Sequence, residues 1–253
     1  MDKKNIATIS EGLAGVTSTA IASWCGEIPG IEFITASLPP FLSRGYKTIL
    51  DEFLGKNLIK RECERLQISF KYTCLQIEDN QKKGYKLRDD TFDSNSEKVE
   101  NIIEGVLKKL LDDTEQQKSR FYGYFIANLP YSPEIDYYCA NFLQNTIRKL
   151  SFRQLCLIRY YHDNTSLDVS KWGNYFESGN NTEGFELYAE LLELKNLNLI
   201  KKMPPYSVGA DLEKTRLSQS GETLFKLMGL EHIEYEDIAI VSSLIDKIKY
   251  STQ

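Results

Sequence analysis

The stretch that decides the fold is residues 149–230, which opens with "KLSFRQLCLIRYYHD" (149–163). Its apolar residues recur every three to four positions, which predicts an amphipathic helix. Ser151 and Gln154 have the spacing of a capping box, so the helix is expected to begin there. The side chains expected to face inward are Leu155, Leu157, Ile158 and Tyr161.

The rest of this stretch predicts three further elements and a hairpin. "SLDVSKW" (166–172) is a short middle element, and "TEGFELYAELLELKNLNLI" (182–200) is a helix that stops near Asn198. A strand from Ile200, a turn and a returning strand follow, and "SQSGETLFKLMGL" (218–230) closes as a helix capped by its serine. On the helix of 182–200 the expected inward residues are Phe185, Tyr188, Leu191, Leu192 and Leu194.

This order predicts a mainly α protein that ends in a winged helix, a helix-turn-helix variant with a small β-hairpin. The chain has 253 residues and is 42% hydrophobic and 26% charged, enough to bury a core in one or two domains. We expect an apolar helical segment over 1–55, a helical body over 56–148, the winged helix over 149–230 and a closing helix over 231–253.

The amino-terminal segment has no charged residue between Gly12 and Gly26. This run is shorter than the roughly 18 to 20 residues that span a bilayer, and the segment lacks a signal-peptide pattern. Small residues at every fourth position suit close helix packing. We therefore predict self-association or burial here, with membrane contact through residues 6–42 as the alternative. The predicted seam is Ile6, Ile9, Leu13, Gly15, Val16, Thr19 and Ala20.

The body of the chain reads as amphipathic helices, the strongest of which starts at Glu97. Asp112, Asp113 and Glu115 at its end are interpreted as a solvated face rather than as paired catalytic acids. An aromatic core is predicted from Phe121, Tyr122, Tyr124, Phe125, Tyr137 and Tyr138.

Catalytic patterns are missing from the sequence. The chain has two histidines, and we find no phosphate-binding loop, no dinucleotide fingerprint and no zinc-protease motif. The five cysteines form no C-x-x-C pair and are interpreted as reduced core thiols of a cytoplasmic protein. We therefore predict a protein without enzymatic activity, without a cofactor and without a metal.

Charge bears on whether the winged helix binds DNA. The net charge is −5, and the helix of 182–200 carries Glu183, Glu186, Glu190 and Glu193, which phosphates would repel. This favours protein contact or self-association over sequence-specific DNA binding. The alternative is a DNA-binding transcription regulator, for which the residues in reach of phosphates are Lys201, Lys202, Lys214 and Arg216.

The order "DDTEQQKSRFYGYFIANL", "KLSFRQLCLIRYY", "ELLELKNLNLI" and "TRLSQSGETLFKLMGL" resembles the Abi-alpha type of bacterial abortive-infection protein. The resemblance covers roughly residues 95 to 230. It implies a bacterial cytoplasmic protein in phage defence, without established catalytic residues. The matching positions are Ala127, Asn128, Leu129, Leu217, Ser218 and Gly221.

Overall fold

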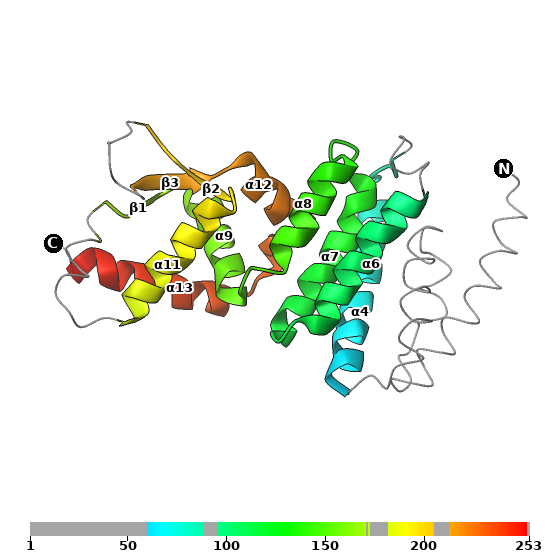
Figure 1. Ribbon diagram of the computed structural model, residues 1–253, viewed down its shortest axis with the longest axis horizontal. Helices are drawn as coiled ribbons and strands as arrows, with labels where there is room; N and C mark the ends of the chain where they lie inside the picture. Colours follow the sequence, from blue (N-terminus) through cyan, green and yellow to red (C-terminus); the bar gives the residue numbers. More distant parts are fainter. Residues whose placement is uncertain (1–59, 89–95, 171, 173–181, 205–212, 252–253) are drawn as a thin grey trace, which may run out of the picture. The chain divides into compact units, whose positions relative to one another are not determined.

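The computed structural model describes residues 60–88, 96–170, 172, 182–204 and 213–251 (Figure 1). These residues are mainly helical, with one small antiparallel sheet. Contacts divide the chain into two compact units, Met1–Arg148 and Lys149–Gln253. The predicted seam that runs from Ile6 to Ala20 lies outside the described residues, so its role in self-association or membrane contact stays a prediction.

The first unit is built from amphipathic helices, as their spacing predicts. Two short 3-10 turns lie beside the third of these helices, so the chain restarts there instead of continuing one long helix. The helices are α4 (Lys60–Lys82), α6 (Ser96–Asp112), α7 (Ser119–Asn128) and α8 (Tyr137–Ile147). The 3-10 turns are Gln116–Lys118 and Leu129–Tyr131.

Helices α4 and α7 approach closely because small residues meet at their crossing. A Cβ on Gly123 would lie 2.3 Å from the carbonyl oxygen of Ser69, so only glycine fits on α7. The Thr73 hydroxyl donates to the Ser69 oxygen at 2.9 Å and lies 3.2 Å from that of Gly123. The predicted aromatic core is confirmed for the four aromatic residues of α7, Phe121, Tyr122, Tyr124 and Phe125, which are all buried.

Two predictions for this unit are wrong. Asp113 is not on a solvated face, since its side chain is only 8% exposed and lies 2.5 Å from Nζ of the buried Lys118. Tyr138 is not a core aromatic, because 77% of it is exposed on α8. Asp113 lies where α6 has ended and the chain turns inward, a bend that helical periodicity does not register.

In the described part of the second unit, three helices lie around a three-stranded sheet, and a fourth helix follows at the carboxyl end (Figure 1). The strand order is β1-β3-β2, and both pairings are antiparallel. The strands are β1 (Leu167–Asp168), β2 (Ile200–Lys202) and β3 (Lys214–Leu217). The helices are α9 (Phe152–Asn164), α11 (Thr182–Asn196), α12 (Gln219–Leu227) and α13 (Tyr235–Ser251).

The predicted two-stranded hairpin is therefore incomplete, because the middle element contributes β1. Leu167 pairs with Thr215 on β3. Tyr161 of α9 contacts the central strand, β3, through a hydrogen bond: its hydroxyl lies 2.7 Å from Oγ1 of Thr215. Thr215 also donates to the carbonyl oxygen of Leu167 at 3.3 Å, so one buried threonine ties the strand to α9 and to its neighbour.

The ends of the elements follow the sequence signals. The capping box of Ser151 and Gln154 is present at the start of α9. Asn198 adopts a positive φ of 56° just after α11, as the stop signal predicts. Ser218 caps α12 by accepting from the amide of Gly221 at 3.1 Å.

The inward face of α11 differs from the prediction. Phe185 is 63% exposed, and Tyr188 and Leu192 are only half-buried. The buried residues are Gly184, Leu187, Leu191 and Leu194. The helix has apolar side chains on more than one face, so periodicity alone does not tell which of them meets the core.

Helix α13 closes the core of the second unit by packing on α9 and α11. Val241, Ile245 and Ile248 are buried there, at 2% exposure or less. The docking surface that the closing helix needs thus belongs to the same chain.

Candidate functional site

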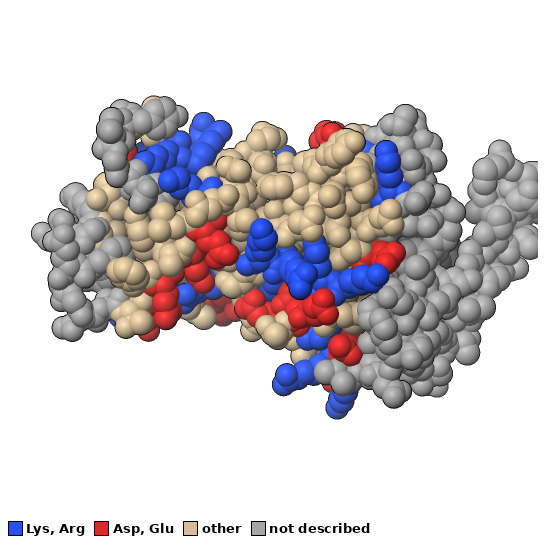
Figure 2. All heavy atoms as spheres, viewed as in Figure 1, with Lys and Arg blue, Asp and Glu red and all other residues tan. Residues whose placement is uncertain are grey.

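Three of the four predicted cations gather on the outer face of the sheet. Lys201 lies directly opposite Arg216 in the register, and Lys214 lies two residues before Arg216 on the same strand. All three are exposed, whereas Lys202 is half-buried on the neighbouring position. We call Lys201, Lys214 and Arg216 the basic sheet face. Figure 2 shows the Lys and Arg side chains gathered over β2 and β3.

The three cations of the basic sheet face lack an ion-pair partner within the described residues, although Asp168 lies opposite Lys214 on β1. No acidic side chain there forms an ion pair with any of its three members. Asp168 pairs in register with Lys214, but its carboxylate accepts from the hydroxyl of Ser170 at 2.7 Å. Like charges placed opposite each other on neighbouring strands destabilise a sheet, so a binding role would give a reason to keep them.

Two arginines of α9, by contrast, are paired with carboxylates. Arg153 on α9 reaches Glu190 at 2.8 Å and Glu186 at 3.5 Å. The two carboxylates hold the pKa of Arg153 above its usual value against the cost of its partial burial. Arg159 pairs with Asp163 at 2.7 Å.

The acidic residues of α11 face neighbouring helices. Glu190 accepts from Arg153, and Glu193 accepts from the side-chain amide of Gln154 at 2.8 Å. Glu183 lies 3.5 Å from Lys247 of α13. The band of Asp and Glu side chains along α11 in Figure 2 is therefore partly engaged within the unit.

The outward face of α11 is largely uncharged. The exposed Phe185 and Ala189 lie four residues apart on it, and the exposed Asn196 follows two turns on. Hydrogen-bonding contact with base edges typically uses Arg, Lys, Asn or Gln, and only Asn196 is of that kind on this face.

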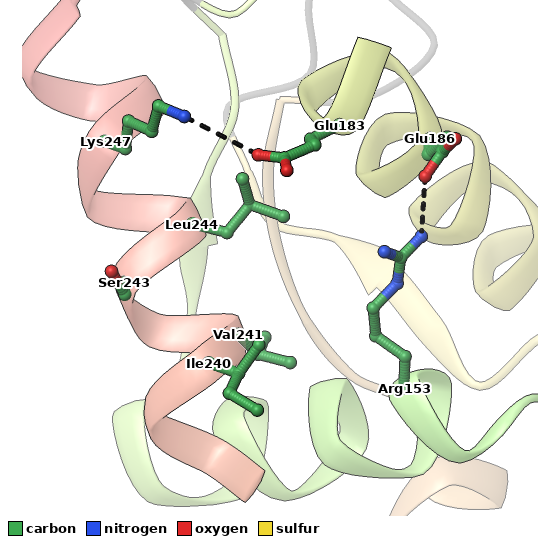
Figure 3. A pocket seen from close by; sticks show the side chains of 8 residues that line it. All are labelled: Arg153, Glu183, Glu186, Ile240, Val241, Ser243, Leu244 and Lys247. Atoms are coloured by element: carbon green, nitrogen blue, oxygen red, sulfur yellow. Dashed lines mark ion pairs between the residues drawn. The ribbon is translucent and has the colours of Figure 1, made fainter. Parts of the chain in front are cut away.

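A cleft of about 360 Å³ opens between α13 and the first turns of α11, with Arg153 of α9 at one end. Figure 3 shows Leu244 and Val241 pointing into it from α13, between the ion pairs Lys247–Glu183 and Arg153–Glu186. Ile240 lies at its rim and is 68% exposed. Nucleophiles with an adjacent base are not found among the residues that line it.

The buried polar cluster of the first unit is also a candidate to weigh. The Tyr122 hydroxyl donates to Asp113 at 2.6 Å, and Arg65 donates to the backbone oxygens of Asp113 and Leu111. Burial and the Asp113 charge raise the pKa of Tyr122. These bonds join Arg65, Asp113 and Tyr122 across three segments of the first unit, so the cluster is a structural contact between α4, the end of α6 and α7.

Among the described residues, no histidine or cysteine is part of a metal-binding cluster, and Cys25 lies outside them. His162 stacks on Phe225, with ring centres 3.8 Å apart, and its Nδ1 lies 3.4 Å from Glu222. Cys63, Cys74, Cys139 and Cys156 are free thiols. No group of three or more His, Cys, Asp or Glu within the described ranges is placed to hold a metal ion. In the same part of the chain, no helix has both the length and the apolar character needed to cross a membrane.

A scan against protein-family models found no match, and the comparisons with curated proteins and with solved structures found none either.

Sequence reasoning found the cations of the sheet but missed two features around them. The pairing of Arg153 with Glu186 and Glu190 joins residues more than thirty positions apart, so only the packing of α9 on α11 reveals it. The exposure of Phe185 was likewise hidden, because a phenylalanine at helical spacing from Tyr188 and Leu192 is expected in the core.

Proposed function

We propose that the protein is a non-enzymatic bacterial defence or regulatory protein that acts through protein contacts, and that residues 149–230 are its winged-helix module. The order α9, β1, α11, β2, β3, α12 with strand order β1-β3-β2 supports the module. The resemblance to abortive-infection proteins supports the defence role.

One observation carries the preference for protein contact. Helix α11 is the one that a winged helix would place in the major groove, and its outward face presents Phe185 at 63% exposure instead of cations. Exposed aromatic side chains are typical of protein interfaces, where they act as anchors. Glu186 and Glu193 remain exposed beside this face, although Arg153 and Gln154 engage them, so they would still meet phosphates unfavourably.

The test is a phage-plaquing assay in a bacterial host. Phage should form fewer plaques on cells that express the full chain than on cells with an empty vector. Phe185→Asp should abolish that protection, because a charge on the anchor opposes burial in a partner. The matched control is Gln219→Asp, which adds the same charge at an exposed position of α12 and should keep protection. Equal plaque counts with the wild-type chain and the empty vector would refute the defence role.

The basic sheet face favours a second candidate, a DNA-binding regulator. Three unpaired cations could contact backbone phosphates, which would give affinity that falls with salt. In a fluorescence-anisotropy titration at about 150 mM salt, submicromolar binding that discriminates between duplex sequences would establish this function. Arg216→Glu should then weaken binding to all duplexes alike. We expect weak binding without discrimination.

A further inference from the structure

The second unit carries an acidic counterpart to the basic sheet face. Residues 231–237, "EHIEYED", connect α12 to α13 and include the first turn of α13. Glu231, Glu234 and Glu236 are exposed, and Tyr235 between them is 78% exposed. We call residues 231–237 the acidic segment. An aromatic side chain between carboxylates combines an anchor for burial with charge for steering.

One copy of the unit cannot bring the two surfaces together. Helices α9 and α11 contact the sheet and also contact α13, so they lie between the basic sheet face and the helix that carries the acidic segment (Figure 1). Within one described unit, the acidic segment is therefore not placed to pair with these cations.

We propose that the basic sheet face of one molecule binds the acidic segment of a second copy of this chain. This inference rests on the proposed function, protein contact, and names the partner and the surface. Lys201, Lys214 and Arg216 would pair with Glu231, Glu234 and Glu236, and the exposed Tyr235 would lie against the aliphatic stems of the cations. The repulsion between Lys201 and Arg216 within the sheet would then be offset by the carboxylates of the second copy.

The geometry of this contact is heterologous, since two different surfaces meet. A heterologous contact leaves one basic sheet face and one acidic segment open in each pair, so further copies can add head to tail. Association through exposed charges weakens as salt rises. We therefore expect the average molar mass of the full-length protein in solution, measured by light scattering, to fall as the salt concentration is raised from about 50 mM to about 500 mM.

Two charge-reversed variants of the full chain test the contact. The first, Lys201→Glu with Arg216→Glu, makes the sheet face acidic and keeps the acidic segment. The second, Glu234→Lys with Glu236→Lys, makes the segment basic and keeps the sheet face. In each variant by itself, the sheet face and the segment carry charge of the same sign, so two copies of one variant cannot form the contact. Mixed together, the two variants restore it, because the second offers an intact basic sheet face to the intact acidic segment of the first.

The readout is the affinity of the first variant, labelled at its amino terminus, for either unlabelled variant at about 50 mM salt. We expect the second variant to bind it at least about tenfold more tightly than the first variant does, a difference of about 1.4 kcal/mol. This comparison cancels any association through residues 1–55, which both variants retain. Circular dichroism should give both variants the helical signal of the wild type.

Equal affinities for the two variants would overturn the proposal. If wild-type protein instead binds a DNA duplex in a salt-dependent way that the first variant loses, the basic sheet face belongs to phosphates and the proposal also fails. Neither result touches the test of Phe185→Asp, so failure of this contact and failure of the proposed function are separable. Loss of plaque protection in Phe185→Asp with equal affinities here would leave protein contact standing, with another partner.

Discussion

At the residue scale, the ion pair Lys118–Asp113 is buried in the first unit. Lys118 is 2% exposed and Asp113 8% exposed at the side chain, so neither charge is well solvated. Lys118→Met leaves Asp113 without its cation, and an uncompensated buried charge costs about 3 to 5 kcal/mol of unfolding free energy. Urea unfolding measures this loss.

Two controls separate charge from packing. Lys60 is 91% exposed at the side chain, so Lys60→Met should change the unfolding free energy by less than about 0.5 kcal/mol. Adding Asp113→Asn to Lys118→Met removes the stranded charge and keeps an acceptor for Tyr122. The double variant should therefore be more stable than Lys118→Met alone, and a further loss would contradict the role given to the charge.

Lys109 gives the protein a pH dependence of a predictable sign. It is buried and donates to the Gln144 oxygen at 2.6 Å and to Asn145 at 2.9 Å. Burial, and then the charge of Arg148, lower its pKa from 10.5 to about 8. Below pH 8 Lys109 is protonated in both the folded and the unfolded chain, so the full free-energy cost of burying its charge lowers the stability of the fold. Between 8 and 10.5 only the unfolded chain holds the proton, so this cost disappears as pH rises.

The measurement compares the wild type with Lys109→Met, which cancels the other titrating groups. The unfolding free energy of the wild type minus that of the variant should rise by about 2 to 3 kcal/mol between pH 7 and pH 10.5. A difference that stays flat or falls with pH would show that the folded state does not disfavour the charge on Lys109.

At the element scale, Gly221 lets α12 pack against the backbone between α11 and β2. A Cβ on Gly221 would lie 2.1 Å from the backbone oxygen of Leu199, which also accepts from the amide of Ser218 at 2.9 Å. Backbone atoms cannot turn aside as a flexible side chain can, so Gly221→Ala should lower the unfolding free energy by about 2 kcal/mol or more. Ser220→Ala, at the half-buried preceding position, should stay within about 0.5 kcal/mol in the same urea titration. Equal effects of the two changes would refute the close approach.

The elements also show what a sequence can predict. Caps and stops act within a few residues, so Ser151, Asn198 and Ser218 were identifiable at the right places. Strand β1 has only two residues and no alternation of its own, and its identity depends on pairing with Thr215 nearly fifty residues later. Periodicity chose the wrong face for Phe185 because the tertiary contacts of α11 decide which stripe is buried.

The candidate site likewise has one part that the sequence predicts and another that only the tertiary structure reveals. Lys214 and Arg216 share a face because alternate residues of a strand do, and the sequence supports that much. Their approach to Lys201 depends on the register of β2 with β3, which the sequence does not determine. The engagement of the α11 carboxylates by Arg153 and Lys247 depends on helices packed from far along the chain.

At the scale of the whole molecule, the second unit, Lys149–Gln253, buries a core of its own. Its closing helix supplies Val241, Ile245 and Ile248, each at 2% exposure or less. Burying three such side chains contributes about 5 to 9 kcal/mol, comparable with the entire stability of a typical domain. Whether the unit folds alone should therefore depend on α13.

We expect residues 149–253, expressed without the first unit, to unfold cooperatively on heating. Ending the same fragment at Ile233 removes α13 and uncovers the apolar surface of α9 and α11, so the shorter fragment should lack a cooperative transition. The matched control is Ile240→Ala in the longer fragment. That residue lies on the same helix but is 68% exposed, so its truncation should cost less than about 1 kcal/mol. A cooperative transition in the shorter fragment would mean that the core closes without α13, and the loss of one in the longer fragment would mean that the unit depends on the first.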